Sequence, residues 1–259
     1  MSVAPFSEAQ WALLAGPLRL RPAAERDHPR SLPAQALFSA EQSARLLAAL
    51  GPLIGARAPR VVASLLAKRV SFLATGACLY ALSAYDLGLE LAAENAFIEY
   101  GHDAGVWTSC MPLRRLQPSQ PLPGQRGAWR QAVARELFAG LLQPLWESFH
   151  QATRLPRRIL WENTAVRVYS LYERRLAQHP DAAVRAQARA DLQWLVAEAP
   201  AEVFGLDHNP LQRFYHAATP VAEGGACVRV RRTCCFYYQA STPVEYCTTC
   251  PLLYPRSAR

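Results

Sequence analysis

Apolar side chains recur every three or four residues over most of this chain, a spacing that predicts α-helices. The first long example is 39–52, where Ser39 is placed to cap the helix and Leu47 belongs to an apolar stripe. The segment 59–85 has the same spacing, and its uncharged half is shorter than the roughly 20 residues that cross a bilayer. We therefore expect a buried core helix there.

Three more helices are predicted in the second half of the chain, over 128–153, 156–177 and 179–198. Pro144 predicts a kink in the first of them, because proline removes a backbone donor from the helix interior. Pro156 suits the first turn of the helix over 156–177, because backbone N–H groups there have no intrahelical acceptor.

Two segments alternate apolar and polar residues, as strands do. Residues 87–100 alternate on both sides of a turn at 93–95, which predicts a short hairpin. Residues 227–232 set Val228 and Val230 against arginines, as in a strand with one exposed face. The expected fold class is therefore α+β, mainly helical, with a small β-hairpin region and a C-terminal cysteine-rich segment.

One domain is expected over 1–259, since this length supports a single large core. Within it we expect a variable N-terminal arm and helix (1–58), a helical core with the short hairpin (59–226) and a cysteine-rich binding segment (227–253). A short C-terminal β-hairpin is expected to present the cysteines.

Composition changes this picture little. Apolar residues make up 51% and charged residues 19%, a globular balance that excludes disorder. Net charge is +8, but Lys68 is the only lysine among 28 basic residues, as in proteins from GC-rich genomes, so the charge alone is weak evidence for a partner. The first residues lack the pattern of a signal peptide, so a cytosolic location with reduced thiols is expected.

Four of the seven cysteines, Cys234, Cys235, Cys247 and Cys250, form the pattern C-C-x11-C-x2-C near the C-terminus. Thiolates prefer zinc, cuprous ion or iron–sulfur clusters. Adjacent side chains on extended backbone point to opposite faces, so Cys234 and Cys235 reach a single ion only through a sharp distortion. A [2Fe–2S] core relaxes this demand, because its ligand positions lie farther apart. The spacing favours the cluster, while zinc, a structural cysteine pair and a vicinal disulfide stay open.

The stretches "RRTCCFYYQ" and "YCTTCPL" resemble the C-terminal signature of the siderophore-iron reductases, the FhuF-like ferric hydroxamate reductase family. Weaker similarity, in "LWENTAVRVYSLYE" and "DHNPLQRFY", extends the resemblance over about 60–253. The spacer is one residue longer than in the family, and a turn at 241–243 is the expected place for the extra residue.

The resemblance implies a [2Fe–2S] cluster on Cys234, Cys235, Cys247 and Cys250. It also implies an oxidoreductase that passes one electron to a ferric siderophore of hydroxamate type and so releases ferrous iron. No dinucleotide fingerprint is visible, so electrons are expected from a partner such as a ferredoxin or a flavin reductase system. The resemblance further implies a cytoplasmic protein that binds no nucleic acid. A peripheral position at the inner membrane is compatible with that location.

Two alternatives belong to other classes. One is an interaction module stabilised by zinc on the four cysteines, which binds nucleic acid through its arginines. The other is a non-redox siderophore-handling protein, since siderophore synthetases carry a similar domain without the cysteines. The four cysteines argue against the second alternative.

Other residues near the pattern have weaker indications. Arg231 and Arg232 precede Cys234 closely enough to stabilise a reduced cluster and raise its potential, although strand alternation turns one of the two away. A solvated strand edge is the ordinary explanation for both. Cys227 is a candidate substitute ligand and Cys78 is expected in the core. No substrate-binding residue is identified from the sequence.

Overall fold

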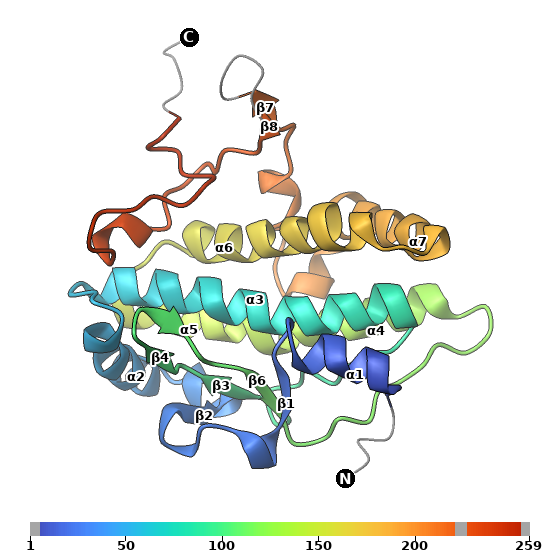
Figure 1. Cartoon of the computed structure of the whole chain (residues 1–259), viewed down its shortest axis with the longest axis horizontal. Helices are drawn as coiled ribbons and strands as arrows, with labels where there is room; N and C mark the ends of the chain where they lie inside the picture. The colour runs from blue at the N-terminus through green and yellow to red at the C-terminus, as the bar shows by residue number, and fades with distance from the viewer. Residues whose placement is uncertain (1–5, 221–226, 255–259) are drawn as a thin grey trace.

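Helix α3, Pro59–Tyr85, runs through the middle of the protein and packs along its length against α6, Arg157–Ser170 (Figure 1). The computed structural model describes residues 6–220 and 227–254. Pro59 lies in the first turn of α3, where its fixed φ suits a helix. Among the described residues α3 alone is long and apolar enough to cross a membrane, and 83% of its most apolar window is buried inside the protein. The expected buried core helix is confirmed.

The other helices surround this pair. They are α1 (Glu8–Ala15), α2 (Ala40–Leu53), α4 (Arg126–Arg135), α5 (Gln143–Thr153) and α7 (Ala182–Gln193). π-Helical segments continue α4, α6 and α7 at Glu136–Leu142, Leu171–Arg175 and Trp194–Glu198. Short 3-10 turns lie at Ala23–Glu25, His28–Arg30, Ala34–Phe38, Leu176–Gln178, Ala201–Phe204, Gln212–Phe214 and Tyr237–Gln239. The N-cap expected at Ser39 is confirmed, since its Oγ accepts a hydrogen bond from the Gln42 amide.

Helical backbone is continuous over residues 126–153, and Pro144 follows directly on the π-helical segment Glu136–Leu142. The kink expected at Pro144 stays a prediction.

Four short strand pairs are present within residues 6–220 and 227–254. Strand β1 (Leu20–Pro22) lies parallel to β6 (Met111–Leu113), and β2 (Ser31–Pro33) lies antiparallel to β3 (Phe97–Glu99). Two small antiparallel pairs join β4 (His102–Asp103) to β5 (Val106–Trp107) and β7 (Thr219–Pro220) to β8 (Cys227–Val228). The fold class, α+β and mainly helical, is confirmed.

The strand partners differ from those expected. The turn at 93–95 forms, but β3 pairs with β2 from the N-terminal segment, so the hairpin predicted within 87–100 is wrong. Residues 6–58 pack into the fold through β1 and β2, and Leu14 and Leu37 are fully buried in the core. The division into an arm, a helical core and a cysteine segment stays a prediction.

The C-terminal segment lies across one end of the α3–α6 pair, near the N-termini of both helices (Figure 1). The hairpin expected to present the cysteines is present as β7–β8, but it precedes them, and its connection at 221–226 lies outside the described residues. Cys234 to Cys250 lie on irregular backbone with one 3-10 turn. Their positions therefore depend on contacts with α3 and α6.

Candidate metal centre

The four C-terminal thiols come together as two pairs. The sulfurs of Cys235 and Cys247 lie 3.7 Å apart, and Cys234 shares a side-chain contact with Cys250. Each pair thus takes one member from the adjacent cysteines and one from C-x-x-C. A left-handed residue, Phe236 with φ 62°, follows the adjacent cysteines and turns the chain sharply.

The two halves of the pattern are joined through the backbone. The Arg231 amide donates to the Thr249 carbonyl at 2.9 Å, and the Cys250 amide donates to the Cys247 carbonyl at 2.9 Å. Cys235 is 1% exposed and Cys250 is 2% exposed, while Cys234 and Cys247 are partly open. Each sulfur pair therefore has one buried member and one near solvent.

This arrangement fits two metal centres better than one. Two thiolates on one tetrahedral centre, with metal–sulfur bonds of about 2.3 Å, lie about 3.8 Å apart. The Cys235–Cys247 distance of 3.7 Å matches that value for a single pair. Within 6–220 and 227–254, no three His, Cys, Asp or Glu side chains converge on a single ion position. Two pairs of thiols are the donor set that a two-iron cluster requires.

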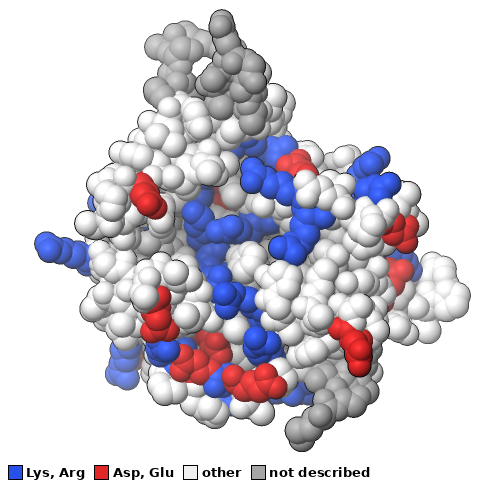
Figure 2. All heavy atoms as spheres, in the orientation of Figure 1, with Lys and Arg blue, Asp and Glu red and all other residues white. Residues whose placement is uncertain are grey.

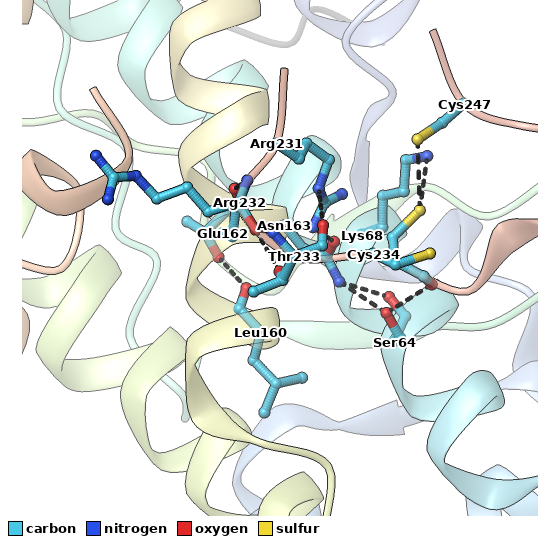
Figure 3. A network of polar contacts seen from close by, with 12 residues as sticks. Ser64, Lys68, Leu160, Glu162, Asn163, Arg231, Arg232, Thr233, Cys234 and Cys247 are labelled. Carbon is cyan, nitrogen blue, oxygen red and sulfur yellow. Dashed lines mark hydrogen bonds and ion pairs between the residues drawn. The ribbon is translucent and has the colours of Figure 1, made fainter. Parts of the chain in front are cut away.

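A buried carboxylate holds the chain that enters the cysteines. Glu162, on the second turn of α6, is 1% exposed and accepts hydrogen bonds from the Arg232 amide at 2.6 Å and the Thr233 amide at 2.8 Å (Figure 3). The Thr233 hydroxyl also donates to this carboxylate. A carboxylate that accepts backbone amides fixes their position firmly, because these hydrogen bonds are charge-assisted.

A second set of contacts ties α3, α6 and the cysteine segment together. Asn163 donates to the Ser64 carbonyl at 2.9 Å, and the Ser64 hydroxyl donates to the Cys235 carbonyl at 2.9 Å. The Arg231 guanidinium, 4% exposed, donates to Asn163 Oδ1 at 2.7 Å and lies 3.8 Å from Glu162. This network is closed and buried, so it orients the thiols in a defined way.

The only lysine of the chain lies beside the thiols. Lys68 Nζ, from the third turn of α3, is 3.9 Å from Cys235 Sγ, and it also lies over the Tyr237 ring. Burial lowers the pKa of Lys68, and the Cys235 sulfur opposes that shift. The hydrogen bond shared with Cys247, together with the charges of Lys68 and Arg231, lowers the pKa of Cys235 to about 5. The pocket therefore favours thiolate, the form that binds metal, at Cys235. The same hydrogen bond and burial raise the pKa of Cys247.

The three arginines before the cysteines point in different directions. The buried Arg231 guanidinium donates to the Thr233 carbonyl and Asn163 Oδ1, and its charge acts on Cys235 and Cys247. Arg232 is exposed and points away from them in Figure 3. Arg229 pairs with Glu173 at 2.6 Å. That Arg231 or Arg232 tunes a cluster stays a prediction.

The remaining cysteines lie elsewhere. Cys78 is fully buried in α3, and burial raises its pKa, as expected for a core thiol. Cys227 lies in β8 and is exposed, and Cys110 hydrogen-bonds locally to the Thr108 carbonyl. Among the described residues none of the three hydrogen-bonds to the four C-terminal thiols, so the role of Cys227 as a substitute ligand stays a prediction.

A cavity of about 670 Å³ opens beside Lys68, the residue that contacts Cys235 Sγ. Its wall includes Lys68, Arg69, Phe72, Trp107, Arg167 and Tyr237. Two smaller cavities, of about 500 Å³ and 330 Å³, share Arg167 with it, and the smaller one reaches Cys247. Basic side chains gather in a hollow at the centre of this face (Figure 2). We call the surface shared by these cavities the basic groove, defined by its cations Lys68, Arg69, Arg167, Arg174 and Arg175.

Sequence reasoning missed Ser64, Lys68, Glu162, Asn163 and Arg167. Signals existed for three of them. A lone lysine in an arginine-rich chain is a compositional outlier, and Glu162-Asn163 lies in the "WEN" stretch that carries part of the family resemblance. Ser64 and Arg167 have no distinguishing pattern in the sequence.

Comparison with known families gives two matches. Residues 64–218 match the family model described as ferric iron reductase FhuF-like transporter. Residues 231–252 match the FhuF 2Fe-2S C-terminal domain, which spans all four cysteines of the two thiol pairs. No curated protein matches the chain.

Proposed function

Because this chain belongs to the FhuF-like ferric iron reductase family and carries its 2Fe-2S domain, we propose that it reduces ferric siderophores by one electron and releases ferrous iron. The cofactor is a [2Fe–2S] cluster, which supplies single electrons when bound. We assign its ligands to Cys234, Cys235, Cys247 and Cys250. The sulfur pairing at 3.7 Å supports that assignment.

One observation carries the proposal. Lys68 belongs both to the surroundings of the thiols, 3.9 Å from Cys235 Sγ, and to the wall of the cavity of about 670 Å³. A molecule in that cavity therefore sits one side chain away from the proposed ligands. The volume lies within the usual range for small-molecule sites, roughly 300 to 1,000 Å³.

The reaction needs no acid–base group. Hydroxamate oxygens are hard ligands and hold ferric iron far better than ferrous iron, so one electron is enough to weaken the complex. The chain's tasks are to bind the chelate, to bring its iron near the thiols and to keep the thiol segment fixed. Phe72, Trp107 and Tyr237 offer apolar walls for the first task, and Glu162 and Asn163 perform the last.

The substrate is proposed to be a ferric siderophore of hydroxamate type. The protein is proposed to be cytoplasmic, and a peripheral position at the inner membrane is compatible with that location. Electrons are proposed to come from a ferredoxin or a flavin reductase system. The zinc alternative loses its support, because the C-terminal match is to a 2Fe-2S domain.

An anaerobic iron-release assay tests the proposal. Holoprotein, a ferric tris-hydroxamate and a ferrous-specific chromogenic chelator are mixed with either NADPH alone or NADPH plus a ferredoxin and its reductase. We expect ferrous iron only in the second mixture. The absence of release above the protein-free control in both mixtures would refute the function, and equal release with NADPH alone would refute the partner.

A further inference from the structure

The basic groove holds positive charges without counter-ions. Among the described residues, Lys68, Arg69, Arg167, Arg174 and Arg175 form no ion pair with a carboxylate. Eight other arginines of the chain do form such pairs: Arg30, Arg45, Arg115, Arg126, Arg130, Arg157, Arg229 and Arg231. Other described arginines, such as Arg21 and Arg213, also lack a carboxylate partner, so what sets the groove apart is that five such cations line cavities that share Arg167.

Arg167 shows this most clearly. Its side chain lines all three cavities, and its Nε is buried with no hydrogen-bond partner within the described part of the chain. A buried charged donor without a partner is costly unless an anion satisfies it. The nearest ring, Phe72, lies 5.7 Å from the guanidinium and leaves that donor unsatisfied.

The carboxylates that do line the cavities are already engaged. Glu162 accepts the Thr233 amide, Glu173 pairs with Arg229, and Glu245 accepts the Tyr237 hydroxyl. The cavity of about 500 Å³ contains Arg167, Arg174 and Arg175 and no carboxylate. A ligand in the groove therefore meets a net positive wall.

The cluster accounts for only part of this charge. Lys68, Arg167 and Arg231 act electrostatically on Cys235 and Cys247, so they serve the negative charge at the thiols. Arg69 also lines the large cavity and donates to Ser109 Oγ at 2.8 Å. Arg174 and Arg175 lie beyond Arg167 on the π-helical continuation of α6.

From these charges we infer that the groove selects ferric chelates with a net negative charge, such as a siderophore that binds iron through hydroxamates together with citrate-type carboxylates. The inference rests on the proposed function and narrows its substrate. The aromatic wall accommodates the organic backbone of the chelate, and the unpaired cations meet its carboxylates. An uncharged tris-hydroxamate would leave Arg167 unsatisfied.

Binding of redox-inert gallium chelates to oxidised holoprotein tests this. Three probes are compared by titration calorimetry: an anionic citrate–dihydroxamate, a neutral tris-hydroxamate and a tris-hydroxamate with a pendant ammonium. We expect the anionic probe to bind at least about tenfold more tightly than the neutral one at low ionic strength, with the gap closing as salt is added.

Arg167→Gln and Arg174→Gln should each weaken binding of the anionic probe by about three- to tenfold and leave the neutral probe unchanged. Arg45→Gln is the matched control, because Arg45 is an exposed arginine of α2. The absorption spectrum of each variant reports whether the cluster is intact, and Arg174→Gln tests the groove away from the thiols.

Equal affinity for all three probes would overturn the inference. So would an unchanged affinity in both arginine variants combined with a raised KM for the electron donor, since the groove would then be the donor's docking surface. If the iron-release assay fails for every ferric chelate, the proposed function itself fails. If the three probes bind with equal affinity while iron release is intact, only the proposed selectivity for negatively charged chelates is refuted.

Discussion

Lys68 Nζ lies 3.9 Å from Cys235 Sγ, while the same lysine forms part of the wall of the cavity of about 670 Å³. The lysine reaches Cys235 from α3, which lies far from the cysteines in sequence. A cluster with four thiolate ligands is doubly negative when oxidised and triply negative when reduced. A cation at this distance favours the reduced form, so Lys68 is placed to control how easily the protein accepts an electron.

Replacing Lys68 by methionine should lower the reduction potential of the cluster by about 30–60 mV, since about 1.4 kcal/mol corresponds to 59 mV for one electron. The loss of an N–H donor and the loss of a positive charge both lower the reduction potential. Protein-film voltammetry measures the shift. Lys68→Arg should retain most of the parent potential, and a methionine variant within about 10 mV of the parent would show that the ammonium has no tuning role.

Each of the proposed ligands, Cys234, Cys235, Cys247 and Cys250, should be required for the cluster. Its substitution by serine should abolish or strongly shift the visible absorption of the [2Fe–2S] centre and lower the iron content. Cys78→Ser and Cys227→Ser should keep both. An unchanged spectrum and iron content in any of the four ligand variants would remove that residue from the ligand set.

Arg231 and Arg232 should behave differently although they are adjacent. The charge of Arg231, which is 4% exposed, acts on Cys235 and Cys247, whereas the exposed Arg232 points away in Figure 3. Arg231→Gln should lower the potential by tens of millivolts, after a solvent-screening discount on the Coulomb energy of about 2 kcal/mol at 8 Å. Arg232→Gln should leave it within about 10 mV. Equal potentials in voltammetry for both variants and the parent would mean that this segment does not tune the cluster.

The Glu162 carboxylate should stabilise the thiol segment. Glu162→Gln removes an acceptor for the Arg232 and Thr233 amides and leaves a buried donor unpaired, at a cost of about 1–3 kcal/mol. The holoprotein should melt at a lower temperature and lose iron faster to a chelator. Glu41→Gln, an exposed change on α2, serves as the control. Iron loss at the parent rate would show that other contacts hold the segment.

Much of the helical architecture could be predicted, because the apolar spacing of 59–85 and the cap at Ser39 are local properties. Strand pairing could not. The partner of β3 is β2, far upstream, and a strand of three residues carries too little alternation to specify a distant partner. The turn at 93–95 was visible, but its hairpin was not the one formed.

The candidate site likewise has a part that could be predicted from the sequence and a part that could not. The cysteine pattern pointed to a metal centre, because its spacing is itself chemical information. Nothing in the spacing links Lys68 or Ser64 to Cys235, since those contacts arise only when α3 packs beneath the C-terminal segment. The basic groove likewise combines residues from α3 and from the end of α6.

The central claim is electron transfer from the reduced cluster to a ferric chelate, and a single-turnover experiment tests it most directly. Holoprotein is reduced with one equivalent of dithionite, freed of excess reductant and mixed anaerobically in a stopped-flow instrument with a ferric siderophore. The account predicts that the oxidised cluster spectrum returns, with about one ferrous ion trapped per cluster, and that the gallium analogue causes no change. A cluster that stays reduced in the presence of excess ferric chelate would contradict it.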